Sequence, residues 1–339
     1  MSPPRKPFHT LFTSAGRRVE LLRAFRRAYQ ELELPGRVIA TDIDPLAPAL
    51  QVADRGFLMP RLGEDSYLPA LEALCRREEI SLIFPLIDPD IEVLSRHRDQ
   101  LAELGARAAV VAPEAVAATA DKWDSQQFFR SLGLPTANSW LPGDADLAQQ
   151  DFPLFIKPRQ GSASQFTFRV ENQRQLEFFL DYVPNPIVQE FLPGPEITTD
   201  VVADLDGEIM GLVSRRRIAV RSGEVIKGVT IKDPRIFDGA VKIARALPAV
   251  GPITVQCLYK GDVPYFTEIN ARLGGGLPLG LAAGVESPRW LLARSAGLPL
   301  ELPPLGSYQE GLHLSRFDDS FFLGERELET FAGRGFRSR

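Results

Sequence analysis

An alternation of strand-like and helix-like segments in the N-terminal third is the strongest constraint on the fold of this chain. Apolar runs typical of strands occur at residues 9–13, 37–41, 80–84 and 108–111. The segments between them have the period of amphipathic helices, with apolar side chains on one face at positions 21, 22, 25, 28, 29 and 32. Strands that alternate with helices form a parallel sheet covered by helices. We therefore predict an N-terminal parallel α/β domain over residues 1–112.

Polar loops follow strands of this domain at residues 14–18, 42–44 and 88–90. Ligands of such sheets bind at the carboxyl ends of strands, whereas Asp and Ser also suit ordinary turns and helix caps, so both alternatives stay open. In the first case Arg17 or Arg18, at the start of a helix, would bind the carboxylate of a substrate. The loop lacks a G-x-G-x-x-G fingerprint, so we do not expect a dinucleotide site, although Asp42 lies where such a fold has its ribose acid.

A lysine closes an apolar strand in the next region. Helices are predicted from Pro113 and from Asp121, and a strand follows at residues 153–158. Lys157, near the end of this strand, is costly to bury without an anion. The small residues of the following loop, 159–165, expose backbone N–H groups that can cradle phosphate, although a plain hairpin tip is the alternative.

Antiparallel strands are predicted in most of the remaining sequence, with two turns and one helix between them. They lie at residues 187–191, 200–205, 208–217, 224–232, 253–259 and 265–269, with the helix at 237–247. Arg215 and Arg217 share one strand face. This face either binds a substrate carboxylate or phosphate, which we favour, or is a solvated edge protected by charge. The sequence beyond Pro303 has no pattern that we can assign.

The last of these strands carries two oxygen-bearing side chains at a spacing of two. Glu268 and Asn270 therefore lie on the same face, and carboxylate and amide oxygens are ligands that suit magnesium. Arg272 would extend this face and offer a rigid fork for an anion. Glycines at 274–276 allow close approach of the backbone to a ligand. A polar turn at the end of a surface strand is the alternative interpretation.

Charge and cysteine content argue against several classes of function. The formal charge is −5, from 39 basic and 44 acidic residues, which gives no support for nucleic-acid binding or a basic membrane patch. No run reaches the roughly 18 apolar residues of a membrane span. Cys75 and Cys257 lie far apart without a pairing pattern, which favours a reducing compartment, and we interpret both as buried hydrophobes. We expect a soluble cytoplasmic protein with no nucleic-acid or membrane partner.

The order of these motifs is more specific than any one of them. It runs through Asp121-Lys122, Lys157 with its small-residue loop, Gln189-Glu-Phe-Leu with Glu196, Gln256, and Glu268-Ile-Asn-x-Arg with its glycines. This order resembles the ATP-grasp superfamily, and within it the carbamoyl-phosphate-synthetase-like single-chain ligases. The resemblance implies a fold of mixed α/β and α+β class. Its parts would be a Rossmann-like pre-ATP-grasp domain with a parallel sheet over residues 1–112, an ATP-grasp small lobe with linker helices over 113–185, and an ATP-grasp C-terminal lobe with a tail over 186–339.

The resemblance also implies roles for individual residues. Those implied to bind the nucleotide are Lys122, Lys157, Gly161, Ser162, Glu190, Phe191, Leu192, Glu196, Gln256 and Glu268. The two lysines and the loop 161–164 would contact the phosphates, the segment 190–192 the adenine, and Glu196 the ribose. Mg²⁺, with Mn²⁺ as an alternative, would bind Gln256, Glu268 and Asn270. The residues implied to be catalytic are Arg272, Lys157, Arg215 and Arg217.

The sequence departs from the family pattern at two places. Ala271 stands where the family commonly has proline, and because alanine adopts the same extended backbone we do not expect this to alter the site. The loop 161–164 is poorer in glycine than in many members, so its closure is expected to be less mobile.

The activity implied by the resemblance is that of an ADP-forming carbon–nitrogen ligase. ATP would activate a carboxylate as an acyl phosphate, which an amine, such as that of an amino acid, would then displace. A carbamoyl-phosphate-type synthetase and a non-catalytic nucleotide-binding regulatory protein are the alternatives. The expected partners are small-molecule carboxylate and amine substrates, and a homo-oligomer is an open alternative. The sequence does not identify the two substrates.

Overall fold

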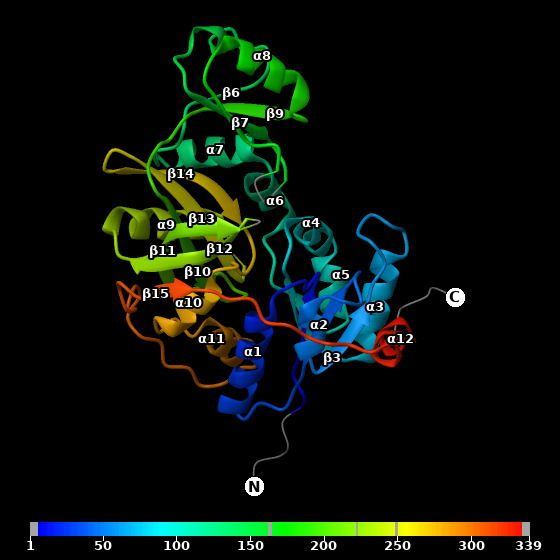
Figure 1. Cartoon of the computed structure of the whole chain (residues 1–339). Coiled ribbons are helices and arrows are strands. Elements are labelled where there is room, and N and C mark those ends of the chain that lie inside the picture. The colour runs from blue at the N-terminus through cyan, green and yellow to red at the C-terminus, as the bar shows by residue number, and fades with distance from the viewer. Residues whose placement is uncertain (1–5, 162–164, 222, 248–249, 334–339) are drawn as a thin grey trace.

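The computed structural model describes residues 6–161, 165–221, 223–247 and 250–333 of the 339-residue chain. Within these residues the strands form three sheets that follow one another along the chain (Figure 1). The first sheet is parallel and the other two are antiparallel. The predicted combination of an α/β domain with a two-lobed α+β region is therefore confirmed.

The parallel sheet of the N-terminal domain has the strand order β3-β2-β1-β4-β5. Its strands are β1 (His9–Thr13), β2 (Val38–Asp42), β3 (Arg55–Leu58), β4 (Ile80–Pro85) and β5 (Arg107–Ala108). Its helices are α1 (Val19–Glu31), α2 (Pro48–Val52), α3 (Tyr67–Arg77), α4 (Asp88–Arg96) and α5 (Arg98–Glu103). The predicted alternation is confirmed, but α2 and β3 are additional to the prediction. The strand expected at 108–111 is wrong beyond Ala108: the Ala109 N–H still donates to the Ile83 carbonyl of β4 at 2.8 Å, but residues 109–111 lie outside the strand.

Three phenylalanines fix α1 against this sheet. The rings of Phe12 in β1 and Phe84 in β4 are stacked with centroids 5.5 Å apart, and Phe25 of α1 meets Phe12 edge-on at 4.8 Å. All three side chains are buried, and each such ring pair adds about 0.5–1.5 kcal/mol beyond the burial of its area. This packing places the loop between β1 and α1 at the carboxyl edge of the sheet.

The small lobe follows two linker helices, α6 (Pro113–Ala120) and α7 (Lys122–Ser131). Its sheet has the order β6-β9-β7-β8, formed by β6 (Ser139–Trp140), β7 (Leu154–Pro158), β8 (Phe168–Val170) and β9 (Pro186–Glu190). Helix α8 (Gln173–Tyr182) covers one face through Leu176, and the lobe forms one end of the molecule (Figure 1). Because β9 pairs with β6 and β7, the small sheet extends to Glu190, past the boundary expected at residue 185.

The large lobe is built on a six-stranded antiparallel sheet of order β14-β13-β10-β11-β12-β15. Its strands are β10 (Glu196–Ala203), β11 (Ile209–Arg221), β12 (Glu224–Ile231), β13 (Pro252–Lys260), β14 (Val263–Asn270) and β15 (His313–Ser315). Helix α9 (Pro234–Ala246) packs on one face through Ile236, Ala240 and Ile243. The predicted strands of this region are present and mostly longer than expected, and the predicted helix is shifted by a few residues.

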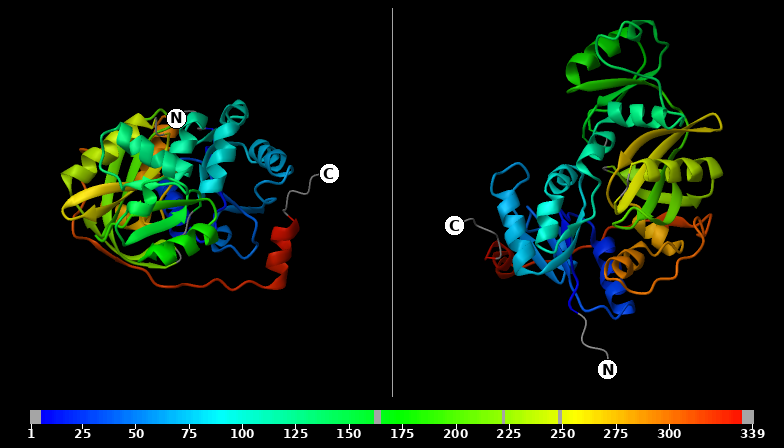
Figure 2. Two further views of the ribbon diagram at one scale, coloured as in Figure 1. Left: turned by 90° about the horizontal axis from the view of Figure 1, so that it is seen from above. Right: turned by 180° about the vertical axis from the view of Figure 1, so that it is seen from behind.

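The segment after Asn270 returns the chain to the N-terminal domain. Helices α10 (Leu277–Ala282) and α11 (Ser287–Ser295) lie against α1. Beyond β15 the chain runs along the outside of the molecule to α12 (Glu325–Gly333), which lies near β3 (Figure 2). This part of the fold was not assignable from the sequence, because its elements are short and depend on neighbours distant in the chain.

Both cysteines are buried, as predicted. Cys75 lies in α3 and Cys257 in β13, and burial raises the pKa of each thiol to about 12. Neither is therefore a reactive thiolate at neutral pH. Among the described residues, none of the helices combines the length and apolar character needed to cross a bilayer.

The contact between α9 and β14 leaves no room for an added methyl group at Gly239. A Cβ at Gly239 of α9 would lie 2.2 Å from Cζ of the buried Phe266, whose ring also packs against Phe129. We predict that Gly239→Ala destabilises the protein by about 1–3 kcal/mol, because overpacking outweighs the helix propensity gained. Urea unfolding would measure this as a lower midpoint. Asp238→Ala, on the exposed side of the same helix, is the control, and a midpoint of Gly239→Ala at or above that control would contradict the prediction.

Candidate active site

A cleft of about 720 Å³ is lined by residues of the N-terminal domain, the small lobe and the large lobe. The predicted site residues that line it are Lys122, Lys157, Gly161, Glu190, Phe191, Leu192, Glu196, Arg215, Arg217, Gln256, Glu268, Asn270 and Arg272. Ser162 and the rest of the loop 162–164 lie outside the described residues. The fold thus brings together side chains that are separated by up to 150 positions in the sequence, from Lys122 to Arg272. Their individual roles remain predictions.

Strand register places one row of polar side chains across the floor of this cleft. Arg215 of β11 lies opposite Thr198 of β10, Thr198 lies opposite Gln256 of β13, and Gln256 lies opposite Glu268 of β14. Residues directly opposite one another on antiparallel strands have neighbouring side chains on the same face. A second row follows two residues along the strands and contains Asp200, Thr254 and Asn270. Both Glu268 and Asn270 line the cleft, as their spacing predicted.

The oxygen atoms of these rows suit a hard cation only if phosphate oxygens and water supply the rest of its coordination sphere. The Glu268 side chain makes no hydrogen bond or salt bridge to a described residue, whereas Asn270 Oδ1 accepts a hydrogen bond of 3.2 Å from Arg272 Nη2. No group of three or more His, Cys, Asp or Glu residues among the described part of the chain could hold a metal ion. A magnesium ion would thus have one carboxylate and amide oxygens here, a donor set that magnesium takes when phosphate oxygens and water complete its octahedron.

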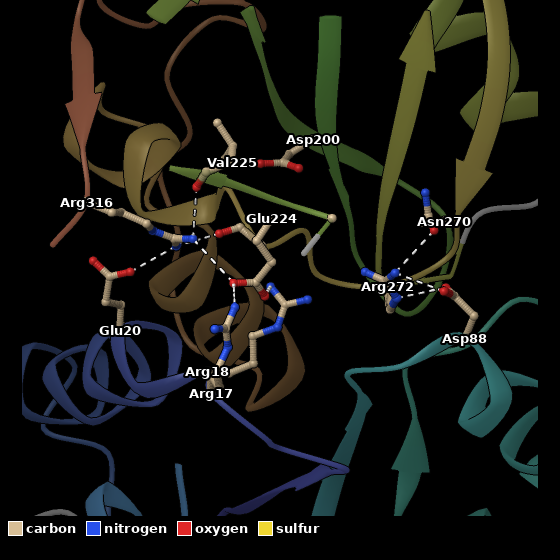
Figure 3. A network of polar contacts seen from close by, with 12 residues as sticks. Arg17, Arg18, Glu20, Asp88, Asp200, Glu224, Val225, Asn270, Arg272 and Arg316 are labelled. Carbon is tan, nitrogen blue, oxygen red and sulfur yellow. Dashed lines mark hydrogen bonds and ion pairs between the residues drawn. The ribbon is translucent and has the colours of Figure 1, made fainter. Parts of the chain in front are cut away.

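Arg272 joins the large lobe to the N-terminal domain. Its Nε donates to Asp88 Oδ1 at 2.8 Å, and its Nη2 donates to Asp88 Oδ2 at 2.9 Å (Figure 3). This bidentate pair holds the guanidinium at the edge of the cleft with its charge already balanced. The resemblance implied that Arg272 faces a transferred phosphoryl group, and the structure adds a protein carboxylate as its partner.

The three polar loops of the N-terminal domain differ in what they contact. Asp42 accepts a hydrogen bond of 3.0 Å from the Asp44 N–H, which is ordinary turn chemistry, and one of 2.7 Å from the Gly16 N–H, which ties the loop 14–18 to the end of β2. Asp90 is fully buried and accepts from Thr13 Oγ1 at 2.6 Å, and burial raises its pKa to about 6. Only Asp88 and Arg18 of these loops line the cleft.

The two arginines of β11 are engaged by carboxylates of β10. Arg215 is buried and forms a bidentate pair with Asp200, in which Nη2 donates to Oδ1 at 3.1 Å. Arg217 pairs with Glu196 and donates to the Gly223 carbonyl at 2.8 Å. Since β11 lies between β10 and β12, the alternative interpretation as a solvated edge strand is wrong. Glu196, implied by the resemblance to bind ribose, is also the partner of Arg217.

The three glycines after Arg272 are required by side chains of the protein itself. A Cβ at Gly276 would lie 2.0 Å from Arg215 Nε, and a Cβ at Gly275 would lie 2.7 Å from Arg18 Nη1. The backbone of this segment therefore passes directly over two guanidinium groups. The glycines permit approach of the backbone to Arg215 and Arg18, and because they also line the cleft, the expectation that they allow approach to a ligand stays a prediction.

Two lysines face the cleft from the small-lobe side. Lys157, near the end of β7, is 8% exposed, and its Nζ lies 5.9 Å from the centroid of the Phe155 ring and makes no hydrogen bond to a described residue. Burial lowers its pKa to about 8, with Glu268 opposing this shift and Lys122 adding to it. Lys122 Nζ donates to the Gly161 carbonyl at 2.8 Å. A buried ammonium group with so few partners is expected to gain from an anionic ligand.

The segment that connects the small lobe to the large lobe forms another wall of the cleft. Glu190, at the end of β9, pairs with Lys260 and accepts a hydrogen bond of 2.9 Å from the Asn138 N–H. The Arg169 guanidinium lies 4.5 Å from the centroid of the Phe191 ring, and Leu192 is buried. An apolar side chain and a backbone turn at this position can hold a flat heterocycle.

Sequence reasoning missed Asp200 and Thr198, and although it named the loop with Asp88 as a candidate contact, it missed the pairing of Asp88 with Arg272. Asp200 and Thr198 have the same strand parity as Glu196, so the period of β10 could have placed them on the cleft face. The pairing of Asp88 with Arg272 has no local signal, because it joins residues 184 positions apart.

The ion pair between Asp88 and Arg272 should contribute measurably to stability. Their side chains are 27% and 14% exposed, so Asp88→Asn leaves a largely buried guanidinium without its carboxylate. We predict destabilisation by about 1–3 kcal/mol. The exposed pair of Arg107 and Asp206 also joins the N-terminal domain to the large lobe, and Asp206→Asn is expected to change stability by less than about 0.5 kcal/mol. Equal urea midpoints for the two variants would contradict this assignment.

Comparison with known proteins agrees with this architecture. Residues 10–109 match the family model described as PylC-like, N-terminal domain, and residues 183–317 match the model described as ATP-grasp in the biosynthetic pathway with Ter operon. Together the two models span more than half of the chain.

Solved structures with a similar fold include three enzymes. A biotin carboxylase from Campylobacter jejuni in complex with β-γ-ATP has a TM-score of 0.69 at 20% identity, over 90% of this chain and 74% of that one. An N5-carboxyaminoimidazole synthetase from Staphylococcus aureus complexed with ADP has a TM-score of 0.71 at 13% identity, over 91% and 82%. An L-amino acid ligase from Bacillus licheniformis has a TM-score of 0.67 at 16% identity, over 88% and 76%. At these identities the likeness establishes the fold. The family models thus identify a PylC-like N-terminal domain at residues 10–109 and an ATP-grasp domain at residues 183–317 of this chain.

Proposed function

We propose that this protein is an ATP-dependent carboxylate–amine ligase that forms ADP and phosphate. The observation that carries the proposal is the opposition, across one cleft, of a buried and weakly compensated lysine on the small lobe and a row of oxygen-bearing side chains on the large lobe. Lys157 supplies a cation for phosphate oxygens. Glu268, Asn270 and Gln256 supply oxygens for the divalent cation that accompanies a nucleotide.

The nucleotide is proposed to lie between the two lobes. The adenine would contact Phe191 and Leu192 in the connecting segment, with Glu190 and Glu196 beside it, and the phosphates would extend toward Lys122, Lys157 and the backbone at Gly161. The C. jejuni and S. aureus proteins of similar fold were solved with β-γ-ATP and with ADP, which supports a nucleotide in this cleft. A bound Mg²⁺ or Mn²⁺ would neutralise charge on the phosphate oxygens.

The chemistry requires positioning more than covalent participation by the protein. A substrate carboxylate oxygen attacks the γ-phosphorus, a new O–P bond forms, and the bond to the β,γ-bridging oxygen breaks to release ADP. The nitrogen of an amine then attacks the acyl carbon, the C–O bond breaks, inorganic phosphate leaves, and the amine proton passes to water. Lys157 and Arg272 would stabilise the negative charge that moves during these steps, and Arg215 and Arg217 would shape the wall beside them.

Two other functions make different predictions in one assay. A carbamoyl-phosphate-type synthetase would release ADP with bicarbonate in place of an organic acid. A non-catalytic nucleotide-binding protein would bind ATP and release no ADP with any carboxylate. ADP release over a panel of amino acids, other organic acids and bicarbonate, each with and without an amine, separates the three functions.

Replacement of Glu268 tests the metal assignment. Glu268→Gln keeps the shape of the side chain and removes the only carboxylate among the three proposed metal ligands Gln256, Glu268 and Asn270. ADP release should therefore fall by about 100-fold or more. Because Glu268 makes no salt bridge to a described residue, the unfolding midpoint should change little. Glu301→Gln, at an exposed position, is the control. Normal turnover by Glu268→Gln would refute the metal role, and loss of the fold would make Glu268 structural.

The depressed pKa of Lys157 predicts a pH dependence of ATP binding. Since its pKa in the free protein is about 8, the ammonium group loses its proton as pH rises through 8. The affinity for ATP should therefore fall between pH 7 and 9. Phosphates raise the pKa of a neighbouring ammonium group, so ATP binding near pH 8 should be accompanied by uptake of a fraction of a proton per molecule bound. Calorimetry in buffers of different ionisation enthalpy can measure this uptake.

A matched variant separates this effect from loss of structure. Lys157→Met keeps most of the apolar stem and should weaken ATP binding by about 10- to 100-fold, with no proton uptake, while adenosine binds nearly as before. If ATP and adenosine lose affinity equally, Lys157 supports the fold and not the phosphates.

A further inference from the structure

Two consecutive arginines in the loop between β1 and α1 have different environments. The side chain of Arg17 is 55% exposed, whereas that of Arg18 is 16% exposed and lines the cleft. The sequence left open which of them would reach a ligand. The structure selects Arg18, at the end of the cleft that also contains Arg272 and Asp88 (Figure 3).

The charge of Arg18 is incompletely balanced by the protein. Its salt-bridge partner is Glu224, whose Oε1 lies 3.7 Å from Arg18 Nη1, too far for a hydrogen bond. The Glu224 carboxylate is shared with Arg17 at 3.2 Å and Arg316 at 3.7 Å (Figure 3). The other carboxylate at this end, Asp88, is engaged in both of its oxygens by Arg272.

The other charged residues around Glu224 do not supply a further negative charge for Arg18. Arg316 pairs with Glu20 at 2.9 Å and donates to the carbonyls of Gly275 at 2.6 Å and Val225 at 3.2 Å. Among the described residues, the cluster contains the guanidinium groups of Arg17, Arg18, Arg272 and Arg316 and the carboxylates of Glu20, Asp88 and Glu224. Cations of this cluster therefore exceed its anions by one, and the least compensated cation, Arg18, lines the cleft.

The lowered pKa of Arg18 agrees with this excess of positive charge. Burial lowers its pKa to about 10, Glu224 only partly offsets the shift, and Arg272 and Arg316 add to it. The group is still charged at neutral pH, and removing a charge from water without a full partner is costly. An anionic ligand with a planar carboxylate or a phosphate would accept two parallel hydrogen bonds from this fork.

We propose that Arg18 binds a second anionic group on the acid substrate, so that the preferred substrates are acids with a carboxylate or phosphate in addition to the carboxylate that is activated. The inference rests on the proposed function, because it assigns one end of the same cleft to the acid. Arg18 lines the same cleft as Arg272, whose charge lowers the pKa of Arg18. It comes from the N-terminal domain, whereas the segment proposed to hold the adenine connects the two ATP-grasp lobes. This end of the cleft is thus proposed to select the acid by its charge.

Matched pairs of acids test this preference directly. Each pair has the same skeleton with the second group charged or neutral: glutamate and glutamine, aspartate and asparagine, phosphoserine and serine. ADP release with ATP and Mg²⁺ is measured for each, with ammonia as the amine. For the pairs that turn over, kcat/KM should be at least about 10-fold higher for the doubly anionic member. The carboxylate and phosphate pairs show which of the two groups the site prefers.

Variants of the two arginines assign the preference to a residue. Arg18→Met should abolish the difference within a pair by raising KM for the doubly anionic acid, Arg18→Lys should retain part of it, and Arg17→Met should leave it in place. The affinity for ADP should be the same in all variants, since the nucleotide lies elsewhere in the cleft. If Arg18→Met does not fold, the wild-type preference and its partial loss in Arg18→Lys carry the test.

The outcomes distinguish failure of the inference from failure of the proposed function. Turnover without a preference for doubly anionic acids, or equal loss in the Arg17→Met and Arg18→Met variants, overturns the inference and leaves the ligase intact. Absence of ADP release with every acid contradicts the ligase. In that case calorimetry measures binding of the same pairs of acids to protein saturated with ADP and Mg²⁺. Tighter binding of the doubly anionic members supports the site at Arg18, and equal binding within the pairs overturns the inference.

Discussion

The antiparallel register of the six-stranded sheet is the constraint on which the cleft depends. Successive side chains of a strand point to opposite faces, so a slip of one residue would turn Glu268 and Asn270 into the core and Ile269 into the cleft. The buried face prevents such a slip. Ile197, Val255, Cys257 and Ile269 pack with Ile236, Ala240 and Ile243 of α9 in one apolar cluster. Burial of apolar area on one side of the sheet thus holds the polar rows on the other side in place.

Charge balance inside the cleft follows from these rows. Three arginines are matched with carboxylates: Arg215 with Asp200, Arg217 with Glu196, and Arg272 with Asp88. Among the described residues that line the cleft, Lys122, Lys157 and Arg18 have no comparably close carboxylate partner, and burial lowers the pKa of Lys157 and Arg18. Lys157 and Arg18 come from different domains, the small lobe and the N-terminal domain. We assign the first to the phosphates of the nucleotide and the second to the acid.

The sequence predicted regular elements well where a local pattern determines them. The strand at residues 9–13 coincides with β1, because its apolar run is bounded by polar residues on both sides. The strand β3 was missed because Arg55–Leu58 contains a single aromatic residue and a glycine. The strand β15 was missed because it is three residues long and exists only through pairing with β12.

The residues that line the site were predictable from local pattern, but their partners across the cleft were not. Same-face spacing and motif order selected residues that all gather in one cleft, apart from Ser162, which the structure does not describe. The partners of the arginines were not predictable, because the register between β10 and β11 and the contact of Asp88 with Arg272 depend on how distant segments pack.

The most direct test of the central claim is a crystal structure with a non-hydrolysable ATP analogue and Mn²⁺. The account predicts adenine beside Phe191 and Leu192, phosphate oxygens within hydrogen-bond distance of Lys157 Nζ, and an anomalous manganese peak coordinated by Glu268 and Asn270. Nucleotide bound outside this cleft, or manganese bound without Glu268, would contradict it.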